Sequence, residues 1–173
     1  SYIDLSIGSN NLISKEISVV DNDQTDRHNF KITANQTSTD GVSVYAEGEE
    51  KDPHEANTFN ISYDYIGNKY ILKLNKIKDT NEMNLDSGSA DVLNYTGDWE
   101  WNNNQIDLQM KNTRVVLNNS KHDRSYTKNG VVDTYNSESN TYLTQHTFNK
   151  DTYDYSVGYE YNEASADFST NIN

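Results

Sequence analysis

The chain contains no cysteine among its 173 residues. This absence excludes a disulfide framework, a thiolate zinc site and a thiol nucleophile. Bacterial surface proteins often lack cysteine, whereas small secreted animal domains usually carry it, so the composition favours a bacterial protein. No apolar run is long enough to cross a bilayer, and we expect no transmembrane segment. A signal peptide or a lipid-bearing cysteine would have to lie upstream of Ser1.

Basic residues are also scarce. The 14 Lys and Arg face 27 Asp and Glu, which gives a formal net charge of -13. Such a charge repels phosphate backbones and anionic membranes, so nucleic acid is not an expected partner. Cations, basic protein patches and neutral glycans remain possible partners.

Hydrophobic residues make up only 33% of the chain, and the mean hydropathy is -0.95. These values are typical of disordered chains. The chain nevertheless holds 13 Tyr, 4 Phe and 2 Trp, and several segments alternate strictly between apolar and polar residues. We therefore expect a single folded domain over residues 1–173 with a thin core, or two subdomains divided near the only proline, Pro53.

The alternating segments follow one another with turn signals between them, and no helical period of useful length is present. Residues 59–65 and 70–74 alternate on either side of Gly67-Asn68, which predicts a β-hairpin with a tight primed turn. A second hairpin is expected to turn at Asn102–Gln105, and a third at Asn129-Gly130. The sequence predicts an all-β fold of ten or eleven short strands, mostly an antiparallel meander, closed into a barrel or folded into a two-sheet sandwich.

Residues 95–110 read YTGDWEWNNNQIDLQM. A Gly-x-Trp step that enters a strand, followed by a turn and an alternating return, resembles the lipocalin-like domains of bacterial cell-surface lipoproteins. The resemblance covers roughly residues 57–150, although Gly97-Asp98-Trp99 lies past the middle of the chain. It implies a barrel or strongly curved sheet on an exported, membrane-tethered protein, and it identifies no ligand.

Aromatic residues supply the candidate binding site. In YDYSVGYEY, every second residue from Tyr153 to Tyr161 is Tyr or Val, so these side chains share one face of a strand. Tyrosine keeps a polar tip on a large apolar body, which suits either a core strand whose hydroxyls reach water or a platform for sugar rings or a protein partner. Likewise, Trp99 and Trp101 either pack in the interior at the bottom of a barrel or form a ligand site exposed to solvent. The candidate ligand-binding residues are Tyr95, Trp99, Trp101, Tyr153, Tyr155, Tyr159 and Tyr161.

A partial metal motif lies in DNDQTDRHN, where Asp21, Asp23 and Asp26 form Asp-x-Asp-x-x-Asp. Calcium prefers several oxygen ligands from a short segment. An EF-hand loop would place a glycine and a later glutamate there, but Arg27 and His28 follow instead. The alternatives are a calcium site and a solvated turn.

Support for catalysis is thin. The four histidines show no paired metal spacing, and the chain has neither a Gly-x-Ser-x-Gly elbow nor a phosphate-binding glycine loop. We expect a non-enzymatic domain, without a cofactor, that is extracellular or on the outer cell surface. It would bind a glycan, a small apolar ligand or a protein segment through Tyr and Trp side chains that share one concave face. The alternative is a self-associating structural subunit of a surface assembly, extracellular filament or adhesin.

Overall fold

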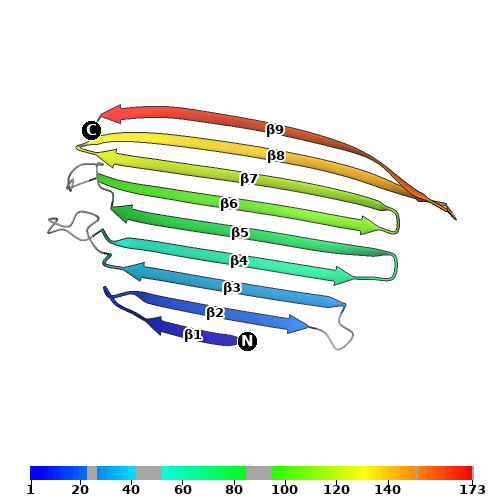
Figure 1. Cartoon of the computed structure of the whole chain (residues 1–173), viewed down its shortest axis with the longest axis horizontal. Coiled ribbons are helices and arrows are strands. Elements are labelled where there is room, and N and C mark those ends of the chain that lie inside the picture. Colours follow the sequence, from blue (N-terminus) through cyan, green and yellow to red (C-terminus); the bar gives the residue numbers. More distant parts are fainter. Residues whose placement is uncertain (23–26, 42–51, 85–94, 151, 173) are drawn as a thin grey trace.

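The computed structural model describes residues 1–22, 27–41, 52–84, 95–150 and 152–172. These residues form one antiparallel sheet whose strand order follows the chain order (Figure 1). Among them, no helix is long and apolar enough to cross a membrane. The strands are β1 (Tyr2–Ile7), β2 (Ile13–Asn22), β3 (His28–Thr39), β4 (His54–Ile66), β5 (Tyr70–Asn84), β6 (Tyr95–Met110), β7 (Thr113–Lys128), β8 (Val131–Asn149) and β9 (Asp154–Ile172).

The all-β antiparallel meander is confirmed, but its details differ from expectation. The described part of the chain has nine strands rather than ten or eleven, and the last two are 19 residues long. β1 and β9 lie at opposite edges of the sheet, so these residues do not close into a barrel, and they contain no second sheet (Figure 1). β3 and β4, on either side of Pro53, pair with each other throughout.

Two of the three expected hairpins form. Lys128 pairs directly with Val131, and the two residues between them, Asn129 and Gly130, have φ angles of 52° and 79°. Positive φ at both positions is the signature of a type I′ turn, and the hairpin that the sequence predicts at Asn129-Gly130 is confirmed. The β4–β5 hairpin also forms, but the prediction of a primed turn at Gly67-Asn68 is wrong, because neither residue has positive φ.

The expected turn at Asn102–Gln105 does not exist. β6 runs without a break from Tyr95 to Met110, and residues 102–105 pair with β5 on one side and β7 on the other. The chain reverses only at Lys111-Asn112, where Lys111 has a φ of 40°. Asparagine reads as a turn residue in sequence, yet it is tolerated in this strand because both faces of the sheet admit polar side chains.

Very little of the protein is buried. Among the described residues, Val116 is the only buried hydrophobic side chain, at 7% exposure, and Ser18 is the only buried polar one. The strands contact only their neighbours in the sheet. The described fold is therefore a single layer with two accessible faces, whereas independently stable domains usually pack two layers around a core.

The strand registers contain no bulge, so every strand residue can be assigned to one face. Residues that pair directly lie on the same face, and successive residues lie on opposite faces. We call the face that carries Ile106 the band face, and the face that carries Trp99 the tryptophan face.

Candidate functional site

The band face carries a continuous apolar row that crosses seven strands. From β3 to β9, each strand contributes one large apolar or aromatic residue that is paired directly with the next. This first row consists of Phe30, Tyr63, Leu74, Ile106, Leu117, Tyr142 and Tyr161.

A second row lies one step closer to the β4–β5, β6–β7 and β8–β9 turns. It is apolar on most strands, with His28 at one end and Thr144 near the other. We define the apolar band as the first row together with the apolar residues of the second. Those residues are Tyr65, Leu72, Leu108, Val115 and Tyr159.

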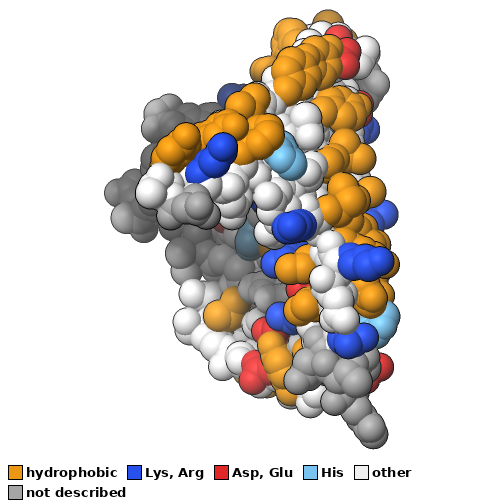
Figure 2. Space-filling view, turned by 90° about the vertical axis from the view of Figure 1, so that its right-hand side faces the viewer, with side chains coloured by type: hydrophobic (Ala, Val, Ile, Leu, Met, Phe, Trp, Pro, Cys, Tyr) orange, Lys and Arg blue, Asp and Glu red, His pale blue; other side chains and the backbone are white. Residues whose placement is uncertain are grey.

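The apolar band is accessible to solvent. Side chains on the central and outer strands are exposed by 43% at Ile106, 39% at Leu117 and 46% at Tyr142. Viewed along the strands, hydrophobic side chains form a nearly continuous column over the height of the sheet (Figure 2). The aliphatic residues Ile3, Ile17 and Val19 extend the apolar surface onto β1 and β2.

The tyrosine stripe of the sequence forms the β9 end of this band. Tyr161 belongs to the first row and Tyr159 to the second, and Tyr155 continues toward the turn. Tyr155 stacks on Phe148 of β8 with a ring-centroid distance of 4.8 Å and an interplanar angle of 13°. Tyr153 lies just before the strand, with its ring 6.4 Å from that of Tyr155. These side chains are exposed, as a binding surface requires.

The tryptophans lie on the opposite face. Trp101 is half-buried, donates from Nε1 to Ser120 Oγ at 2.9 Å, and stacks with His122 at a centroid distance of 5.8 Å. Tyr95 is on this face too, with the Lys128 ammonium 5.1 Å from its ring centroid. These contacts tie the indole of Trp101 and the ring of Tyr95 to their own sheet.

The seven candidate residues therefore do not share one face, and we correct that part of the interpretation. The structure brings Tyr155, Tyr159 and Tyr161 together and separates them from Tyr95, Trp99 and Trp101. Alternation shows which residues of one strand share a face. It does not show whether the odd-numbered or the even-numbered residues of the next strand lie on that same face, because the length of each connection decides this.

The sequence alone does not single out the centre of the band. Ile106, Leu108 and Leu117 alternate like ordinary strand residues, yet they join the tyrosines of β8 and β9 in the same rows. The signal was present in the alternation of these segments. The alternating residues form one surface only because the two-residue connection Lys111-Asn112 fixes the register of β6 and β7.

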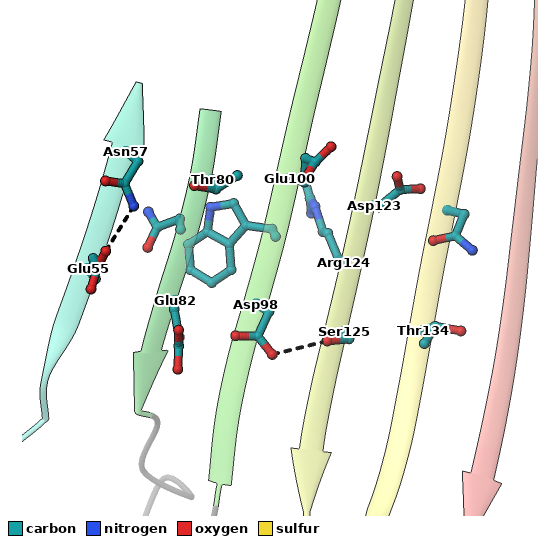
Figure 3. A pocket seen from close by; sticks show the side chains of 13 residues that line it. Glu55, Asn57, Thr80, Glu82, Asp98, Glu100, Asp123, Arg124, Ser125 and Thr134 are labelled. Atoms are coloured by element: carbon teal, nitrogen blue, oxygen red, sulfur yellow. Dashed lines mark hydrogen bonds between the residues drawn. The ribbon is translucent and has the colours of Figure 1, made fainter. Parts of the chain in front are cut away.

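The other half of the band face is polar over β5 to β9, whereas Ile17, Ile32, Phe59 and Ile61 add apolar side chains to it on β2 to β4. An open depression of about 440 Å³ lies over β4 to β8, and polar and charged side chains line most of it (Figure 3). Glu55, Glu82 and Asp98 follow one another in a single row on β4, β5 and β6. Like charges directly opposite each other across strands are unfavourable.

Hydrogen bonds offset part of that repulsion. Asn57 Nδ2 donates to Glu55 at 3.0 Å, and Ser125 Oγ donates to Asp98 at 3.3 Å (Figure 3). The hydrogen bonds from Asn57 and then Gln36 lower the pKa of Glu55. Glu100 lies in the adjoining row, and the ammonium of Lys78, from the row beyond it, lies 2.9 Å from the Glu100 carboxylate.

The Glu100 carboxylate is held charged by its neighbours. The hydrogen bond from Lys78 is the main cause that lowers its pKa, followed by the hydrogen bond from Asn102. Hydrogen bonds that stabilise the charged carboxylate lower the pKa of the group. The polar half is thus a network of carboxylates paired within the sheet.

No metal centre is formed by the part of the chain that the structure describes, in which no three His, Asp or Glu side chains cluster suitably. The predicted calcium motif falls mostly outside that part. Asp21 is near the end of β2, while Asp23 and Asp26 lie outside the described residues. The calcium site stays a prediction.

Comparison with protein-family models, with curated proteins and with solved structures finds no match to this chain. The apolar band is therefore the strongest functional candidate on physical grounds alone.

Proposed function

We propose that the protein is a non-catalytic extracellular or cell-surface module that binds a protein surface through the apolar band. The observation that supports this proposal is the exposed apolar row that crosses seven strands without a gap. Soluble monomers rarely expose one contiguous apolar patch larger than about 300–600 Å², and a larger patch usually marks an interaction site.

The size of the band favours a protein over a small apolar ligand. Six strand spacings separate β3 from β9, which makes the first row roughly 29 Å long. The band and the apolar residues beside it expose an area on the order of 1,000 Å², if each large side chain presents about two-fifths of its surface. A small ligand covers only a fraction of such a surface, whereas a second protein layer covers it all.

A glycan platform on the tryptophan face has less support. Stacking on sugar rings requires free aromatic faces, but the ring of Trp101 already stacks with His122. The second candidate function is a structural subunit of a surface assembly. Its support is that the long edge strand β9 is exposed throughout its length and carries the tyrosine stripe of the band.

An extracellular or cell-surface setting is part of the same proposal. Its support is the acidic composition, with a formal charge of -13, and the lack of cysteine that is frequent in bacterial surface proteins. The acidic surface keeps the free protein soluble despite its apolar band. A barrel of the lipocalin-like kind would need further strands to join β1 and β9, whereas a sandwich needs only a second layer on the band face.

Binding of the neutral apolar dye Nile red tests the proposed function. The folded protein at low concentration is expected to bind the dye, and Tyr142→Thr/Tyr161→Thr is expected to weaken binding several-fold. The matched control is Tyr135→Thr/Phe168→Thr, which removes an aromatic pair from the same two strands on the tryptophan face. Equal loss in both variants, or dye binding only by unfolded protein, would contradict the proposal.

A further inference from the structure

We infer that the occupant of the apolar band is a second copy of this chain, packed face to face to form a two-sheet sandwich. The inference rests on the proposed function and names the partner. Three observations support it: the missing second layer, the area of the band and the distribution of charge on the band face.

A second copy supplies the layer that the sheet lacks. One described hydrophobic side chain, Val116, is buried, so the sheet alone has almost no core. Two sheets pack face to face about 10 Å apart, with side chains of the two inner faces interdigitating. Since the band is made of apolar rows on one face of a sheet, an identical sheet can pack its own rows against it and matches it in chemistry.

The area is sufficient for a stable dimer. A standard protein–protein interface buries about 800 Å² on each partner. The exposed apolar area of the band face, on the order of 1,000 Å², reaches that size. Its aromatic members Tyr142, Tyr159 and Tyr161 are 45–63% exposed, and tyrosine is enriched at the energetic centres of interfaces.

Charge selects the orientation of the second copy. The band contains no Asp or Glu, while Glu55, Glu82, Asp98 and Glu100 all lie on the polar half of the same face. That half also holds Lys76, Lys78 and Lys121, but its carboxylates outnumber them, so a two-fold axis parallel to the strands would superpose two halves of net negative charge. A two-fold axis along the rows, perpendicular to the strands, reverses the strand direction of the second copy. The two apolar bands then face each other, and the polar half of each copy extends beyond the interface at the opposite end from that of its partner.

This arrangement places equivalent residues of the first row opposite each other. Ile106 is on β6, the middle strand of the seven, and lies near the proposed axis. Because each copy carries a net charge of -13, long-range repulsion opposes association. Salt screens that repulsion and strengthens apolar burial, so dimerisation should become tighter as ionic strength rises. A basic partner would show the opposite salt dependence.

Sedimentation velocity over a range of protein and salt concentrations tests this inference on the full chain. The wild-type protein is expected to pass from monomer to dimer, with a dissociation constant that falls at high salt. Tyr142→Thr/Tyr161→Thr should weaken the dimer by about tenfold or more, and Tyr135→Thr/Phe168→Thr should leave it unchanged. A monomer at every concentration, or equal weakening by both variants, would overturn the inference.

A cysteine pair gives an independent result if the double variants do not fold. The chain has no cysteine, so Ile106→Cys introduces a single thiol near the proposed axis, and Gln105→Cys places one on the opposite face. A bifunctional maleimide whose spacer spans the distance of about 10 Å between packed sheets is expected to crosslink the first variant and not the second. If neither crosslinks and the protein binds Nile red as a monomer, the second copy is excluded while the proposed function stands. If neither dye binding nor association occurs, both fail.

Discussion

Tyr142 on β8 and Tyr161 on β9 lie directly opposite each other, with ring centroids 6.0 Å apart on the band face. Seven residues away on each strand, Tyr135 and Phe168 form an equivalent pair at 4.8 Å on the tryptophan face. The two pairs thus lie on the same strands and have similar chemistry, but only the Tyr142–Tyr161 pair belongs to an apolar row that continues across the sheet. Tyr135 and Phe168 make a local aromatic contact, whereas Tyr142 and Tyr161 are part of an extended apolar surface.

The continuity of β6 predicts where the chain tolerates insertions. A Gly-Gly insertion between Asn129 and Gly130 lengthens an exposed turn, and doubling such a short loop costs only about 0.6 kcal/mol. The same insertion between Asn103 and Asn104 should lower the free energy of unfolding by about 3 kcal/mol or more, because it breaks pairing with both β5 and β7.

Urea denaturation measures both variants. If residues 102–105 formed the turn that their composition suggests, the two insertions would have equally small effects. That outcome would contradict the register of β6 and, with it, the alignment of Ile106 and Leu117 in one row.

The sequence predicts the strands better than it predicts the surface. Parts of β4, β5 and β9 carry large apolar residues at every second position, such as Phe59 to Tyr65 and Tyr155 to Tyr161, so their strands could be inferred from local pattern. The turn at Asn129-Gly130 was also predictable, since both residues tolerate positive φ. At Asn102–Gln105 the same kind of reasoning failed, because asparagine composition marks turns but does not require them.

The apolar band was not predictable from one strand at a time. Leu74, Ile106 and Leu117 belong to three strands, and they align only because the connections between these strands set compatible registers. A change of one residue in any connection would move a whole strand to the other face. The grouping of the tryptophans with the tyrosines failed for this reason.

The Glu100–Lys78 pair predicts a small pH dependence. The pKa of Glu100 lies below its ordinary value of 4.5, so the pair contributes stability above that pH and loses it as the pH falls through the folded-state value. Because both side chains are more than one-third exposed, the contribution is a few tenths of a kcal/mol.

Glu100→Gln isolates this effect from the titration of the other carboxylates. The difference in unfolding free energy between wild type and variant should be largest well above the ordinary pKa of 4.5 and should shrink as the pH falls below it. Denaturation at a series of pH values measures it. A difference that stays constant over this range would show that the ion pair does not stabilise the fold.

The tryptophans provide a prediction about the opposite face. Trp101→Phe removes the hydrogen bond to Ser120 and should lower the free energy of unfolding by about 0.5–1.5 kcal/mol. It should leave dimerisation unchanged, because Trp101 is on the tryptophan face. Trp99→Phe is the control, because it makes the same substitution on the same face of β6 without removing the hydrogen bond to Ser120. Weaker association without a loss of stability would instead place Trp101 in a binding contact.

Hydroxyl-radical footprinting at low and high protein concentration reports directly which side chains a second copy covers. Ile106, Leu117 and Tyr142 should be modified readily in the dilute protein and become protected as the concentration rises. Tyr135 and Phe168 should be modified equally under both conditions. Protection of the tryptophan face, or an apolar band that is already protected in the monomer, would exclude the face-to-face dimer.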